Sequence, residues 1–65
     1  MTFKPGDILF WEEFDQEILL VLEVDKKYEE YKVFVLSSSL KYHTGTIRWY
    51  HLIFSATCHL KDKDL

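Results

Sequence analysis

The chain has 65 residues, 48% hydrophobic and 17% aromatic, with a formal net charge of −3 at pH 7. This length predicts one small domain, 1–65, that buries only roughly 60% of the surface its unfolded form exposes, so stability is expected to be marginal. The negative charge and scattered basic residues disfavour nucleic-acid binding, which normally needs a clustered positive surface.

Cysteine content and hydropathy indicate which cellular compartments suit the protein. Cys58 is the single cysteine, so no disulfide can form within the chain, which is typical of a reducing, cytoplasmic location. No leader pattern opens the chain, so a signal peptide is not expected. The longest apolar run, residues 18–22, is far shorter than the roughly 20 residues of a membrane span, and no membrane association is predicted.

The first half of the chain predicts a turn followed by two strands. The turn is "KPGD" at 4–7, where proline presets φ and glycine accepts unusual conformations. The bulky, aromatic stretch 7–13 predicts a strand, and 14–17 a short polar loop. The apolar stretch 18–25 predicts the second strand.

The second half predicts three further strands. Residues 31–37 carry β-branched side chains and predict the third strand, after a charged connection. A long serine-containing loop leads to Gly45, and 46–51 predict the fourth strand. Residues 52–56 are compatible with one helical turn, and 57–60 predict a short fifth strand before a charged tail.

A helix over 12–31 is the competing interpretation. This segment is rich in Glu, Leu and Lys, and some of its apolar residues lie near helical spacing. Alternation of Ile18, Leu20, Leu22 and Val24, and the strand preference of valine, favour the strand. The sequence therefore predicts an all-β fold, a small five-stranded antiparallel barrel of the Src-homology-3-like kind, with an optional short helical turn before the last strand.

Charged residues predict which face of each strand points outward, because successive side chains alternate. Arg48 marks the outer face of the fourth strand, which places Ile47 and Trp49 in the core. Lys32 places Phe34 outside. Alternation counted back from Glu23 along the second strand places Leu19 and Val21 outside. For the first strand the choice between Ile8 with Phe10 and Leu9 with Trp11 stays open.

These orientations leave more apolar side chains than one small barrel can enclose. A contiguous exposed apolar patch usually marks an interface, and Arg and Tyr are enriched at binding hot spots. The predicted partner-binding residues are Leu19, Val21, Phe34, Arg48 and Tyr50. The alternative is that the loop 37–45 or the tail covers the patch.

The chain lacks recognisable catalytic or metal-binding motifs. Cys58 and His59 are adjacent and would point to opposite faces of a strand, while His43 and His51 lie apart, so no metal site is predicted. The carboxylates of 12–17 and 29–30, Glu17 among them, are expected to be solvated. No phosphate loop or nucleophile elbow occurs. We therefore predict no cofactor and no enzyme activity.

Four segments in order, "KPGDILFW", "VLEVD", "YKVFVL" and "GTIRWYH", resemble short uncharacterised proteins encoded by tailed bacteriophages. The resemblance covers about residues 4–51 and implies a phage origin and a small barrel, but no particular activity. The serine-containing loop before Gly45 and the "HLIFSATCHL" ending depart from that pattern.

The predicted function is a small protein-binding module that docks on a phage or host protein, or on its own copy, in the host cytoplasm. Two alternatives stay open. One is a nucleic-acid-binding barrel, and the other is a minor structural protein of the virion.

Overall fold

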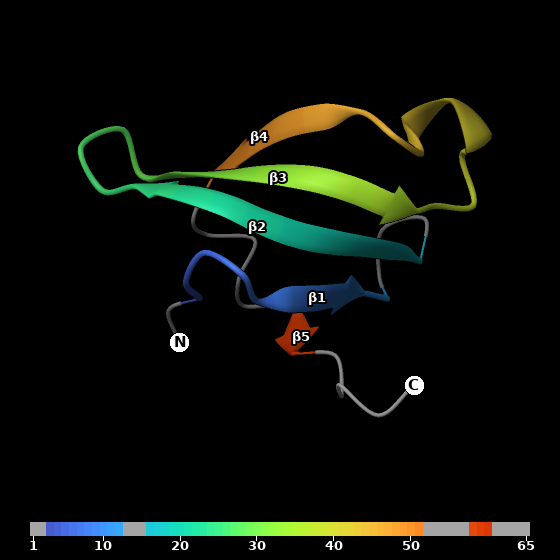
Figure 1. The fold of residues 1–65 in the computed structure, drawn as a ribbon, viewed down its shortest axis with the longest axis horizontal. Helices are drawn as coiled ribbons and strands as arrows, with labels where there is room; N and C mark the ends of the chain where they lie inside the picture. The colour runs from blue at the N-terminus through green and yellow to red at the C-terminus, as the bar shows by residue number, and fades with distance from the viewer. Residues whose placement is uncertain (1–2, 13–15, 52–57, 61–65) are drawn as a thin grey trace.

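The computed structural model describes residues 3–12, 16–51 and 58–60. They form one antiparallel sheet with the strand order β4-β3-β2-β1-β5 (Figure 1). A single turn of 3-10 helix, η1, precedes β4. The elements are β1 (Ile8–Trp11), β2 (Glu17–Asp25), β3 (Glu30–Ser37), η1 (Lys41–His43), β4 (Ile47–His51) and β5 (His59–Leu60).

Local chemistry sets the turns between these strands. Gly6 has φ +93°, which a residue with a side chain rarely adopts, and Asp7 N–H donates to Lys4 C=O at 3.0 Å to close the turn. At the β2–β3 hairpin, the Asp25 carboxylate accepts from the backbone N–H groups of Lys27 and Tyr28. These side-chain-to-backbone bonds reverse the chain, which favours two paired strands over a continuous helix across 12–31.

A β-bulge in β2 changes which of its residues face the core. Val21 pairs with Val33, but Glu23 pairs with the very next residue back along β3, Lys32, so Leu22 is an extra residue. Such an insertion breaks the two-residue alternation of faces. Glu23 therefore points outward, whereas Leu19 and Val21, which lie four and two residues before it, point inward.

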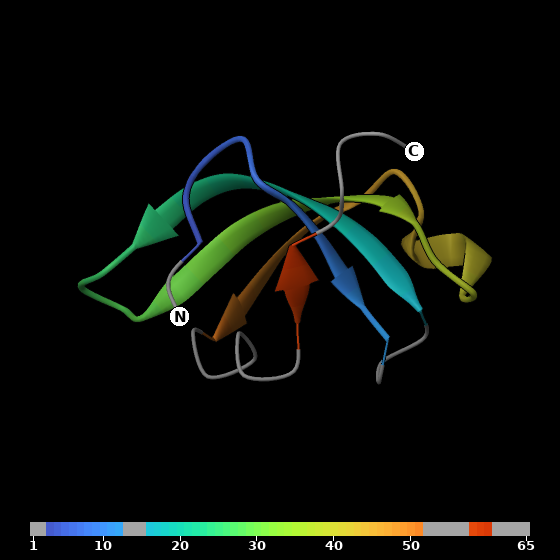
Figure 2. The same ribbon diagram turned by 90° about the horizontal axis from the view of Figure 1, so that it is seen from below.

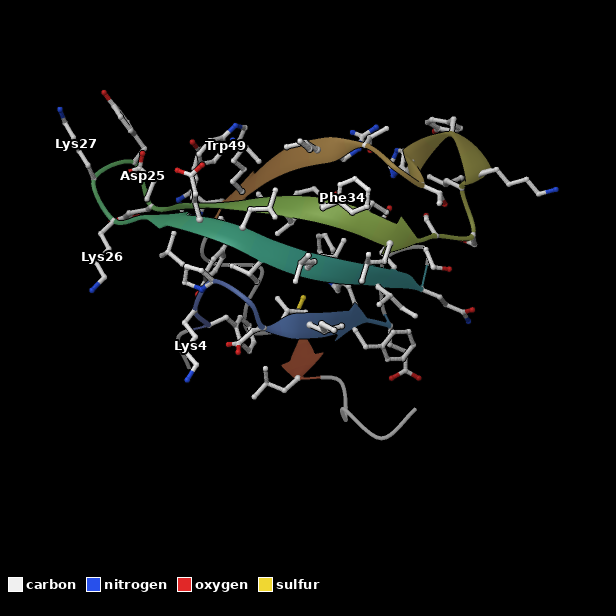
Figure 3. The ribbon with its side chains drawn as sticks, in the orientation of Figure 1. Lys4, Asp25, Lys26, Lys27, Phe34 and Trp49 are labelled. Carbon is white, nitrogen blue, oxygen red and sulfur yellow. The ribbon has the colours of Figure 1, made fainter. Side chains whose placement is uncertain are left out.

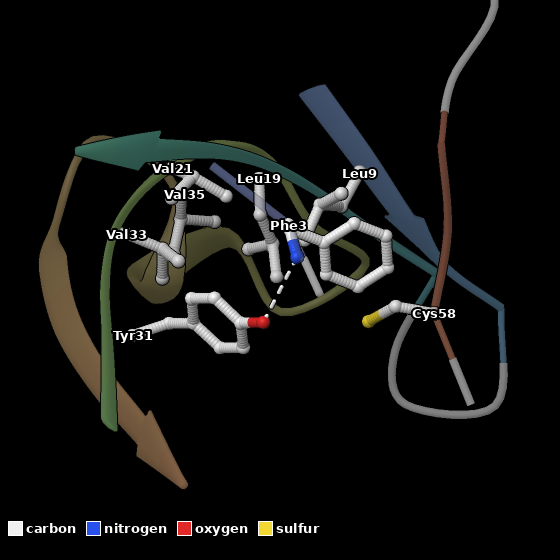
Figure 4. Packing of buried hydrophobic residues seen from close by; sticks show 8 residues of the cluster. All are labelled: Phe3, Leu9, Leu19, Val21, Tyr31, Val33, Val35 and Cys58. Atoms are coloured by element: carbon white, nitrogen blue, oxygen red, sulfur yellow. Dashed lines mark hydrogen bonds between the residues drawn. The ribbon is translucent and has the colours of Figure 1, made fainter. Parts of the chain in front are cut away.

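The core lies on one side of the sheet. Figure 2 shows that the sheet is curved, and Figure 4 shows the buried side chains gathered within the curve. The Tyr31 hydroxyl accepts a 3.0 Å hydrogen bond from Phe3 N–H, which joins the N-terminal segment to β3. The core residues are Phe3, Leu9, Leu19, Val21, Tyr31, Val33, Val35 and Cys58.

The prediction of an all-β antiparallel fold is confirmed, and the helix over 12–31 is wrong. Closure into a barrel stays a prediction, because β4 and β5 are the two edges of the sheet as described and β5 has only two residues. The suggested helical turn at 52–56 lies outside the described residues. The short helical segment that is described is η1, in the loop before β4.

Candidate interaction surface

A row of apolar side chains crosses the outer side of the sheet. Backbone register places Ile8 opposite Leu20, Leu20 opposite Phe34, and Phe34 opposite Ile47, so the row runs across β1, β2, β3 and β4. We call these four residues the outer row. Ile47 is 56% exposed and the other three are half-buried. With strands about 4.8 Å apart, the row is roughly 15 Å long.

Trp49 extends the outer row at its β4 end. It stands on the same face of β4 as Ile47 and is 46% exposed. The Lys32 ammonium lies 5.9 Å from the centre of the Trp49 ring and 3.1 Å from a Glu23 carboxylate oxygen. Figure 3 shows Phe34 and Trp49 on their strands in the view that faces the broad side of the sheet. Glu23 pairs with Lys32, and the register places Asp25 and Glu30 on the same side toward the β2–β3 hairpin, so the outer row is apolar and the hairpin end of this side is acidic.

The outer row departs from the pattern of a sheet that has one solvent-exposed face. Antiparallel sheets commonly alternate apolar residues on the core side with polar ones on the solvent side. Here Leu9 and Leu19 fill the core, while Ile8 and Leu20 beside them face outward. Strands with apolar residues on both faces are typical of sheets that are covered on both sides. The outer side of β1 and β2 therefore has the apolar composition of a covered sheet face.

The predicted orientations of the second strand are wrong. Leu19 is 0% exposed and Val21 1% exposed, so neither can contact a partner. The error arose from counting alternation back from Glu23 across the bulge at Leu22. Phe34, on the unbulged part of β3, points outward as predicted.

The predicted orientation of the fourth strand is also wrong. Arg48 lies opposite the buried Val33, and Tyr50 opposite the buried Tyr31, so both belong to the inner side. Ile47 and Trp49, predicted to be core, face outward. An arginine on the inner side of an edge strand keeps access to solvent past the margin of the core, and Arg48 is only half-buried. Its Nε donates to Thr46 Oγ1 at 3.3 Å.

A buried carboxylate organises the inner side. Glu17 is 0% exposed, contrary to its expected solvation, and accepts hydrogen bonds from three directions. Ser38 Oγ lies 3.0 Å and His43 Nδ1 2.6 Å from Glu17 Oε2, and the Tyr50 hydroxyl lies 3.1 Å from Oε1. A carboxylate is an acceptor with room for several donors, so Glu17 fastens the loop before η1, η1 itself and β4 to the start of β2.

The side chains of this cluster are largely enclosed by the fold. His43 is only 7% exposed. Burial raises the pKa of the Cys58 thiol to about 12, and the nearby negative charge of Glu17 adds to the rise, so the thiol stays protonated and unreactive. Within the described ranges, the His, Cys, Asp and Glu side chains form no group arranged to hold a metal ion.

Sequence reasoning missed Leu20, Ile47 and Trp49 as outward-facing residues and left Ile8 as one of two alternatives. The available signal was the absence of alternation in 8–11 and 18–22, which indicates burial on both sides but does not say which residues face the core. Only the register of the paired strands assigns the faces.

Comparison with protein-family models, with curated proteins and with solved structures finds no match to this chain. In the part of the chain that is described, no helix has the length and apolar character needed to cross a bilayer.

Proposed function

We propose that this protein is a non-enzymatic, phage-encoded protein-binding module that docks through its outer row and Trp49. The proposal includes closure of the sheet into a small barrel of the Src-homology-3-like kind. The strand order β4-β3-β2-β1-β5 supports this, since β4 and β5 are the strands that closure would bring together. In such a barrel the inner side holds the core and the outer side is available for recognition.

The observation that carries the proposal is the four-strand register of apolar residues on the outer side. Ile8, Leu20, Phe34 and Ile47 form one contiguous row rather than scattered exposed side chains. Single exposed apolar residues are ordinary on protein surfaces, whereas contiguous patches usually mark contact sites. Covering each such side chain contributes on the order of 1 kcal/mol, given that each is already partly buried.

Protein is favoured over nucleic acid as the partner class. The one lysine or arginine on the outer side of the described strands is Lys32, and Glu23 neutralises it. Stacking platforms for single-stranded nucleic acid combine exposed aromatic rings with a positively charged groove. Phe34 stands between the aliphatic side chains of Leu20 and Ile47, which suit an apolar protein surface, and the lysine beside Trp49 is paired with Glu23.

The test is site-specific photo-crosslinking in the cells that naturally produce the protein. A benzoylphenylalanine at position 49 replaces Trp49, and the same group at position 28 replaces Tyr28, which is 64% exposed at the β2–β3 hairpin, away from the outer row. We expect a discrete protein adduct from position 49 and none from position 28.

Three results would contradict the proposal. One is the absence of any adduct at position 49 although the variant is folded and abundant. Another is equal crosslinking at both positions, which indicates random collisions. The third is an adduct at position 49 that nuclease treatment removes, which would assign the surface to nucleic acid.

A further inference from the structure

The loop between β3 and β4 is joined to β2 at a single carboxylate oxygen. Ser38 Oγ donates to Glu17 Oε2 at 3.0 Å, and His43 Nδ1 lies 2.6 Å from the same atom. Ser38 stands at the start of the loop and His43 at the end of η1, so these contacts hold the loop near both of its ends. Both contacts therefore depend on the protonation of one group.

The charge of the Glu17–His43 pair matters because both side chains are buried. An anionic Glu17 is compatible with either form of His43, since Nδ1–H donates to Oε2 from the imidazolium and from the neutral ring alike. In acid both groups carry a proton, and an imidazolium then lies against a neutral carboxyl. Burying a charge without a counter-charge is costly. The cation is therefore favoured only where water reaches it.

The groups that surround the pair do not replace the lost carboxylate charge. On the inner sides of β3 and β4, the hydroxyls of Tyr31 and Tyr50 are neutral in acid, and Arg48 is cationic. Cys58, whose pKa is about 12, is neutral as well, and Lys41 in η1 is cationic. β1 consists of apolar residues. An imidazolium beside a protonated Glu17 thus has only neutral and positive groups from these elements around it.

The base of the loop is held by groups that do not titrate. Gly45 N–H donates to Val35 C=O at 2.8 Å, and Val35 N–H donates to Thr46 C=O at 2.9 Å. These backbone bonds continue the pairing of β3 with β4 and do not depend on pH. Loss of the side-chain contacts at Glu17 therefore frees residues 38–44 while the sheet keeps its pairing.

We propose that residues 38–44 form an acid-sensitive conformational switch. The loop stays packed on β2 while Glu17 is ionised, and it separates from β2 when Glu17 takes up a proton. The outward movement carries His43 into water, where its charge is solvated. This proposal does not depend on the proposed function, because neither Ser38 nor His43 belongs to the outer row.

Nitrogen-15 relaxation of the full chain, followed from neutral to acid pH, measures the switch directly. We expect the order parameters of the backbone amides of 39–44 to fall from about 0.85, the value of rigid backbone, to below about 0.6. Those of β2 and β3 should stay near about 0.85. The ring nitrogen shifts should identify His43 as an imidazolium in the open state.

His43→Asn is the test variant, because its amide keeps a donor for Glu17 and carries no charge at any pH. We expect the order parameters of 39–44 to show no acid step in this variant. The matched control is His51→Asn, since His51 Nε2 lies 3.5 Å from Glu29 Oε2 in a pair whose side chains are more than half exposed. The acid step should persist there. Amide spectra establish that each variant is folded, and Glu17→Gln, which cannot take up the proton, replaces His43→Asn if needed.

An acid step that remains in the test variant would overturn the proposal, as would its loss in His51→Asn. A simultaneous fall of the order parameters in the loop and the sheet would also overturn it, because that result describes unfolding of the whole chain. A loop that stays rigid at every pH at which the sheet is folded has the same consequence.

Discussion

Glu17 shows how one side chain can hold distant segments together. Its carboxylate is fully buried yet accepts bonds from Ser38, His43 and Tyr50, which lie 21 to 33 residues away along the chain. Burying a carboxylate is costly unless its oxygens are hydrogen-bonded. Because three donors converge on Glu17, the cost is offset and the positions of η1 and β4 are set relative to β2.

We predict that Glu17→Gln lowers the free energy of unfolding by about 2 kcal/mol, the scale of hydrogen bonds to charged groups. The amide carries no charge and donates from one of the positions where the carboxylate accepted, so the charge-assisted bonds weaken and a hydroxyl partner must reverse its direction. Urea unfolding provides the measurement. Glu23→Gln is the control, since its exposed ion pair with Lys32 contributes at most about 1 kcal/mol. Equal losses in the two variants would contradict the structural role of Glu17.

Cys58 introduces a pH dependence at alkaline pH. Burial, with a contribution from the charge of Glu17, raises the pKa of the folded thiol from 9.0 to about 12. Above pH 9 the unfolded thiol loses its proton while the folded thiol keeps it, so the unfolded state binds fewer protons. The stability due to this group is therefore fully present below pH 9 and is lost between pH 9 and pH 12.

We predict that the stability of the unchanged chain falls between about pH 8 and about pH 10 by about 1 kcal/mol more than that of Cys58→Ala. The variant keeps the tyrosines and lysines that titrate in the same range, so the difference isolates Cys58. Urea midpoints at the two pH values provide the measurement. Parallel changes in both proteins would show that the thiol ionises as easily in the folded state as in the unfolded state.

At the scale of elements, the bulge in β2 decides the composition of both faces. Before the bulge, Leu19 and Val21 enter the core and Leu20 faces outward; after it, Val24 packs against the core. Without the extra residue at Leu22, Glu23 would turn toward the core or Leu19 and Val21 would turn out of it. One inserted position thus lets β2 send apolar residues into the core both before and after Leu22 while Glu23 stays exposed.

We predict that Leu19→Ala and Leu20→Ala, neighbours of identical chemistry, differ strongly in stability. Leu19 is fully buried, so its truncation leaves a cavity and costs about 2 to 5 kcal/mol. Leu20 is half-buried on the outer side, so its truncation costs about 1 kcal/mol in the monomer. Thermal or urea unfolding at low protein concentration compares them. A larger loss of stability for Leu20→Ala than for Leu19→Ala would instead support the orientation predicted by counting alternate residues from Glu23.

At the scale of the whole molecule, an uncovered apolar face coexists with a compact chain. The accessible surface is 4570 Å², against about 4,400 Å² for a folded monomer of 7.9 kDa. The outer row is therefore exposed in a chain that is as compact as other folded proteins, and loose folding is not the cause. The core on the inner side suffices for this compactness.

We predict that the native protein binds a hydrophobic dye such as anilinonaphthalene sulfonate at the outer row. Replacing Ile47 and Trp49 together by serine should reduce native-state dye fluorescence at least by about half without lowering the melting temperature. The matched control replaces the exposed aromatic residues Tyr28 and Tyr42 by serine, and its dye fluorescence should not change. A similar decrease in both double variants would show that dye binding does not report the outer row.

The sequence by itself determined the all-β class and the order of the main strands, because apolar runs and turn residues act locally. Proline, glycine and Asp25 act within a few residues of where they stand, so the turn at 4–7 and the hairpin after 25 could be predicted from neighbours alone. The outward orientation of Phe34 also followed from local alternation, since no bulge separates it from Lys32.

The tertiary structure alone decided the faces of β1, β2 and β4 and the burial of Glu17. A strand with apolar residues on both sides fits the core either way round, and its orientation depends on pairing with strands far along the chain. The amino-acid composition does not reveal a bulge. The bulge nevertheless puts Glu23 and Leu19 on opposite faces, although residues four apart in a regular strand share a face. Glu17 became a core residue because Ser38, His43 and Tyr50 bring donors to it, and only the folded chain places those three side chains together.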